Sequence, residues 1–162
     1  MNTYFKKPVL WDYIISIALC ATFFLLNKRC VVHLASKERS LSMASDISNI
    51  GLTSAGFILT LLTLLITFKS SSRLTKENYD PNEKLFQLFF VSDLYFNTVN
   101  ILKNCVKSLI FISILGYSIK TLTPPDLLIY TLYFNIIGLT IIGLTLWRCL
   151  FILTKILEMQ KE

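Results

Sequence analysis

Residues 47–68 read ISNIGLTSAGFILTLLTLLITF, and this stretch decides the fold class of the chain. It contains no charged residue and ends at Lys69. A helix rises about 1.5 Å per residue, so 22 residues reach across the hydrocarbon core of a bilayer, which is about 30 Å thick. The stretch therefore predicts a transmembrane helix.

Three further apolar runs predict transmembrane helices over residues 9–26, 105–119 and 127–147. Hydrophobic residues make up 54% of the 162 residues and charged residues only 16%, well below the quarter typical of soluble domains. The predicted fold class is an all-α integral membrane protein, with residues 1–162 forming a single transmembrane domain of four helices.

The connections are predicted to differ in character. Residues 28–46 mix basic and apolar residues and predict an amphipathic connector lying at the membrane interface. The residues around position 81 predict the start of a helix. Asp80 suits the N-cap, Pro81 the first helical position and Glu83 the third. From it we expect one long helix to about residue 119, whose part 81–104 extends into the cytoplasm. The fourth helix is expected to continue past the membrane to about residue 160.

The distribution of Lys and Arg predicts the orientation. Eleven of these residues lie on the side of the two termini and five on the other side. The excess places both termini in the cytoplasm of a protein in the inner (plasma) membrane. Asp12, the one acid in the first apolar run, is expected at the headgroup level.

No known catalytic motif occurs in the sequence, and we expect no enzyme activity and no cofactor. The four cysteines show no CxxC spacing, and His33 is the single histidine. This composition argues against a zinc site and against a Cys/His nucleophile pair.

A stripe of polar and small residues recurs at steps of three or four along the second helix, opposite Leu, Ile and Phe positions. Its members, the pore-lining candidates, are Asp46, Asn49, Thr53, Gly56, Thr60, Thr63 and Thr67. Several copies around an axis would form rings of hydroxyl groups, which replace part of an ion's hydration shell. The alternative is ordinary packing between helices in lipid, for which small and hydroxylated residues are also typical.

The fourth helix has a shorter stripe with Thr131, Asn135, Gly138 and Thr145. Asn135 is expected to find an interhelical hydrogen-bond partner.

The third helix carries amides and lysines at helical spacing. The candidates for ligand binding are Asp93, Asn97, Asn100, Asn104, Lys103, Lys107, Lys69 and Arg73. One interpretation is a groove for an anionic, nucleotide-type ligand, since ammonium groups pair with phosphates. The others are the solvated face of a cytoplasmic helix and contact with anionic lipid heads.

The stretch from Gly51 to Phe68, the basic turn after it and the Leu85–Phe96 segment resemble small membrane proteins of bacterial defence operons, similar to the channel-forming effector of the Hailong anti-phage system. The resemblance implies an oligomeric pore whose state depends on a nucleotide-derived signal, a nucleotide or an oligonucleotide, made by a partner enzyme.

The polar stripe predicts a cyclic homo-oligomer in the bilayer that acts as a channel and depolarises the inner membrane, and the resemblance implies that it is an antiviral effector. Two alternatives stay open. One is a non-conducting adaptor that anchors a cytosolic partner, and the other is a holin-like protein.

Overall fold

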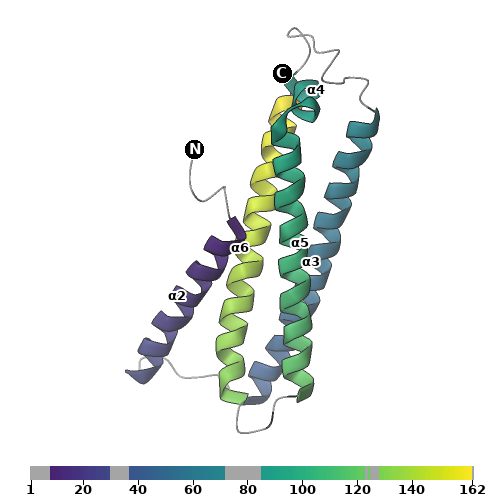
Figure 1. Cartoon of the computed structure of the whole chain (residues 1–162). Helices are drawn as coiled ribbons and strands as arrows, with labels where there is room; N and C mark the ends of the chain where they lie inside the picture. Colours follow the sequence, from purple (N-terminus) through teal and green to yellow (C-terminus); the bar gives the residue numbers. More distant parts are fainter. Residues whose placement is uncertain (1–7, 30–36, 72–84, 123, 125–127, 162) are drawn as a thin grey trace.

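The computed structural model is a bundle of long helices (Figure 1). It describes all residues except 1–7, 30–36, 72–84, 123, 125–127 and 162. The elements in chain order are α2 (Pro8–Lys28), α3 (Lys37–Ser71), α4 (Leu85–Val91), α5 (Asp93–Leu122) and α6 (Leu128–Lys161). The described part of the chain is thus all-helical, and α2, α3, α5 and α6 are each long and apolar enough to cross a membrane.

Helices α3, α5 and α6 lie side by side, while α2 leans against α6 alone for most of its length (Figure 1). Most large apolar side chains of α2 are exposed, and the buried residues are Pro8, Asp12 and Ser16. The bundle therefore consists of a three-helix core and one weakly buried helix.

Small residues bring α3 and α5 close together. A Cβ atom added to Gly116 would collide with Ser48 Oγ and lie 3.1 Å from the carbonyl oxygen of Ala44. One added to Gly51 would collide with Ser113 Oγ. Such spacing of small residues lets two backbones approach, as is typical of helix pairs in lipid.

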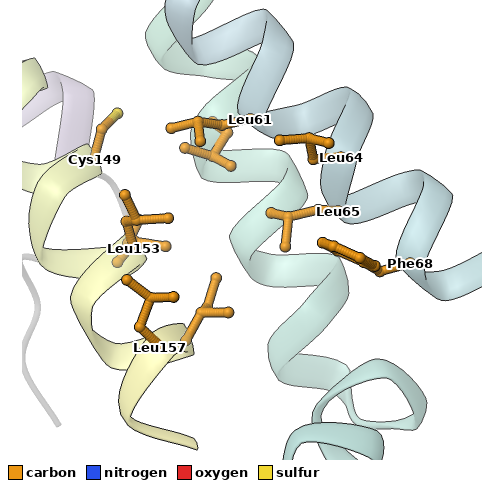
Figure 2. A pocket seen from close by; sticks show the side chains of 10 residues that line it. Leu61, Leu64, Leu65, Phe68, Cys149, Leu153 and Leu157 are labelled. Atoms are coloured by element: carbon orange, nitrogen blue, oxygen red, sulfur yellow. The ribbon is translucent and has the colours of Figure 1, made fainter. Parts of the chain in front are cut away.

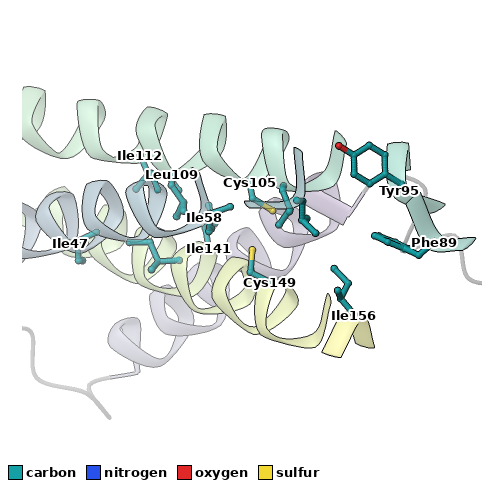
Figure 3. Close-up of a cluster of buried hydrophobic side chains, with 14 of the residues drawn as sticks. Ile47, Ile58, Phe89, Tyr95, Cys105, Leu109, Ile112, Ile141, Cys149 and Ile156 are labelled. Carbon is teal, nitrogen blue, oxygen red and sulfur yellow. The ribbon is translucent and has the colours of Figure 1, made fainter. Parts of the chain in front are cut away.

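Larger side chains complete the core between these helices and α6 (Figure 3). Ile58, Leu109 and Ile141 are almost completely buried there. Gly138 of α6 faces Ile47 and Ile112, which lie 3.1 and 3.4 Å from the position of a Cβ atom on that glycine.

The predicted amphipathic connector is wrong over residues 37–46. Residues 37–46 are not a separate interfacial segment but the first ten residues of α3, and Ser40 and Ala44 are buried in the bundle. Residues 28–36 of the predicted connector include the end of α2, and 30–36 lie outside the described residues.

The predicted continuous helix after residue 81 is interrupted at Ser92. The hydroxyl of Ser92 donates to the carbonyl oxygen of Phe89 at 2.8 Å, and α5 begins at Asp93. The bend allows Phe89 and Phe90 to be buried beside Tyr95, with ring centroids 6.0 and 5.7 Å from that of Tyr95. Burial of these aromatic rings outweighs the continuity of the helix.

Candidate functional site

The polar stripe of α3 lies on the outside of the bundle. All seven of its members are exposed: Asp46, Asn49, Thr53, Gly56, Thr60, Thr63 and Thr67. The opposite side carries the expected large apolar residues at Ile47, Ile58 and Leu65, but small residues share it. That side packs through Ala44, Ser48, Gly51 and Ala55, whereas Phe57 and Leu59 are exposed beside the stripe. The stripe is thus exposed and lies outside the buried contacts of α3 with α5 and α6.

The threonine hydroxyls of the stripe donate to backbone carbonyl oxygens four residues earlier. These bonds measure 2.9 Å for Thr53, 3.1 Å for Thr60, and 3.0 Å for Thr63 and Thr67. A hydroxyl bonded in this way is tolerated by an apolar neighbour, yet its oxygen still has a lone pair for a water molecule or ion. Asn49 differs, because its side-chain oxygen accepts a hydrogen bond from the Tyr117 hydroxyl of α5.

The amides and lysines predicted to bind a ligand form an exposed face of α5. Its members are Asp93, Asn97, Asn100, Lys103, Asn104 and Lys107. Lys69 does not join them, because its ammonium lies 4.4 Å from the ring centroid of Tyr95 and 3.9 Å from that of Phe96. Arg73 lies outside the described residues. The structure therefore gathers six of the eight candidates on one helix face but forms no enclosed ligand pocket from them.

The stripe of α6 faces inward, in contrast to that of α3. Thr131, Asn135 and Thr145 are all at most 2% exposed. The Asn135 amide donates to the backbone oxygen of Ser40 in α3 at 2.7 Å, which confirms the predicted interhelical bond. This stripe serves packing within the chain.

A buried ion pair joins α2 to α6, and the sequence analysis missed it. Arg148 Nη2 donates to a carboxylate oxygen of Asp12, and both side chains are almost completely buried. Asp12 is thus not at an exposed headgroup level. An acid and a base in two otherwise apolar runs were a signal for this pair, because unpaired charges in such surroundings are costly.

Other polar groups extend the contact around the ion pair. The hydroxyls of Tyr13 in α2 and Ser108 in α5 lie 3.0 Å apart, and Ser16 donates to the backbone oxygen of Asp12. Cys105 and Cys149, both buried, point toward each other between α5 and α6 (Figure 3). These cysteines and Cys20 are free thiols.

An apolar crevice of about 130 Å³ opens between α3 and α6 (Figure 2). Leucines of both helices line it, including Leu61 and Leu64 on one side and Leu153 and Leu157 on the other. Its walls offer a ligand almost no hydrogen-bonding groups. Within the described residues, no group of three His, Cys, Asp or Glu side chains is placed to hold a metal ion.

Comparison of the chain with protein-family models, with curated proteins and with solved structures returned no match.

Proposed function

We propose that the chain is a multi-pass protein of the inner membrane, with both termini in the cytoplasm, and that copies of it assemble into an ion channel. Large apolar side chains on the outside of all four long helices support the membrane location. Examples are Phe24 of α2, Phe57 of α3, Phe111 of α5 and Leu150 of α6, each about half exposed. Only a surrounding apolar phase makes such a surface favourable.

The observation that carries the channel proposal is the outward position of the α3 stripe. The other interpretation of this stripe is packing between helices in lipid, and the packing found within the chain uses the other side of α3. A line of hydroxyls along a helix free of charge from Ile47 to Phe68 is then available either to lipid or to a water-filled path between copies. The path needs several copies, because one stripe on the outside of the bundle can line a path only together with the stripes of its neighbours.

The test uses purified protein in planar bilayers and compares two double variants. Thr60→Leu with Thr63→Leu removes two stripe hydroxyls and narrows the proposed path, so single-channel conductance should fall at least about tenfold, the effect of a barrier raised by about 1.4 kcal/mol. Thr22→Leu with Thr154→Leu is the matched control. These threonines are also exposed and bonded to their own helix, at 2.7 and 2.9 Å, but lie on α2 and α6.

A second measurement covers a channel that is closed in the bilayer. Induction in cells should collapse the membrane potential reported by a dye, and the stripe variant should not. A protein silent in both assays, and silent also in cells that make the proposed nucleotide-type signal, is not a channel, and the adaptor role would then be preferred. If the Thr60 and Thr63 substitutions leave the conductance unchanged, α3 does not line the conducting path.

The resemblance to effectors of bacterial defence operons suggests the biological role of the channel. In this role, the channel is an antiviral effector controlled by a nucleotide-type signal that a partner enzyme makes. Size measurement in detergent tests the cyclic oligomer on which the proposal depends, since a strict monomer would exclude it.

A further inference from the structure

Four contacts fix how α3 and α5 lie along each other. Near one end Asn49 bonds Tyr117 and Gly51 faces Ser113, while near the other end Lys69 lies over Phe96. Ser48 against Gly116 agrees with the same register. Counting residues inward from either end places Lys107 at the level of Ile58 and Lys103 at the level of Leu62.

Both lysines belong to the side of α5 that borders the α3 stripe. A line of exposed positions runs along α5 at steps of three or four residues. Its first and last members, Phe96 and Tyr117, contact Lys69 and Asn49 of α3. The positions are Phe96, Asn100, Lys103, Lys107, Ile110, Ile114 and Tyr117. The threonines of α3 and the two ammonium groups therefore share one outer face of the bundle, which we term the α3–α5 face.

The level of the lysines is unusual for a charged group. The segment of α3 alongside them has no charge over 22 residues, and Lys107 lies about ten residues, roughly 15 Å, from the end of that segment at Phe68. A lysine stem is too short to bring its ammonium from there to the membrane surface. Neither lysine is in the two ion pairs found among the described residues.

Charged side chains at such a depth face water or a partner, since exposure of an ammonium to lipid is costly. In the proposed assembly, water is present only in the conducting path. We infer that the α3–α5 face lines this path and that Lys103 and Lys107 make the channel prefer anions. The inference rests on the proposed function and names its class of permeant ion.

The acids on the same helices do not offset this preference. Glu38 and Asp46 precede the uncharged segment of α3, and Asp93 begins α5 beyond the level of Lys69. All three therefore lie at the mouths, where water and salt screen their charge. Lys103 and Lys107 lie in the section where a narrow path with apolar walls screens charge least, so they dominate the choice between ions.

The test measures the reversal potential of the reconstituted protein in a KCl gradient. The wild type should show a chloride-to-potassium permeability ratio above one. Lys103→Gln with Lys107→Gln should lower this ratio about tenfold, which corresponds to about 1.4 kcal/mol between the two ions. The control, Lys28→Gln with Lys155→Gln, removes two exposed charges from α2 and α6 and should leave the ratio unchanged.

The outcomes separate this inference from the function on which it rests. If the protein conducts but prefers potassium, the inference is wrong and the channel proposal stands. The same holds if the chloride-to-potassium permeability ratio is unchanged by the substitutions at Lys103 and Lys107. Lys103→Glu with Lys107→Glu is a second variant, for use if the first one changes folding. It replaces both positive charges by negative ones and should reverse the preference, so that potassium permeates better than chloride. Absence of conductance from every protein, and of depolarisation in cells, overturns the channel itself.

Discussion

The contact of α3 with α5 and the contact of α2 with α6 hold the bundle together by different means. The first relies on small residues, with Gly51 and Gly116 each admitting a serine of the other helix. The second buries few side chains and relies on an ion pair between Asp12 and Arg148. Close packing spreads stability over many atoms, whereas a buried pair concentrates it in two, so single changes should affect the two contacts differently.

Removal of one charge from the α2–α6 contact should have the largest effect. Asp12→Leu leaves Arg148 buried without its carboxylate, which should lower the free energy of unfolding by about 3–5 kcal/mol. Arg148→Met should also lower the free energy of unfolding, because it leaves the Asp12 carboxylate buried without the guanidinium. Thermal unfolding in detergent measures both effects.

The double change Asp12→Leu with Arg148→Met is the control for this prediction. It removes both charges together and should restore most of the lost stability. A double variant no better than Asp12→Leu alone would show that packing, rather than the ion pair, decides this contact.

The next largest effect is expected in the α3–α5 contact. Gly116→Val forces a side chain against Ser48 and the backbone oxygen of Ala44, and overpacking of this kind costs about 1–3 kcal/mol. Gly143→Val is the matched control, since a Cβ atom at this exposed glycine meets nothing within 4 Å. Equal melting temperatures for the two variants would contradict the close approach of α3 and α5.

The smallest effect should come from Tyr13→Phe, which deletes the hydrogen bond to Ser108. Hydrogen bonds between membrane helices contribute about 0.6 kcal/mol on average, so only a small loss of stability is expected. Tyr130→Phe, at a side chain that is 61% exposed, serves as the control. A loss as large as that of Asp12→Leu would mean that the hydroxyl, not the charge, anchors α2.

The sequence was sufficient to predict the helical class and the four candidate spans, because hydrophobic runs of this length are a strong signal. The interior partner of Asn135 was also predictable, since a buried amide requires one. The direction of the α3 stripe was not, because periodicity groups residues on one face without telling whether that face points inward. α6 has a similar stripe, and it points inward.

The pairing of Asp12 with Arg148 was missed for a related reason. Each residue was considered within its own helix, where both lie near one end of an apolar run and so resemble interfacial residues. Only the lateral placement of α2 against the middle of α6 brings them together (Figure 1). The break at Ser92 was equally hidden, because it depends on aromatic burial and not on a proline or glycine.

The separation of Asp12 and Arg148 in the sequence affects how the protein is made. The two residues are 136 positions apart, so a ribosome adding about 5–20 residues per second delivers the arginine roughly 7–27 seconds after the aspartate. Until then α2 lacks the guanidinium that the Asp12 carboxylate contacts in the folded protein. The contact of α2 with α6 therefore forms only after Arg148 has been made, and a chain truncated before Arg148 would expose α2 without this anchor to the proteases of the cell.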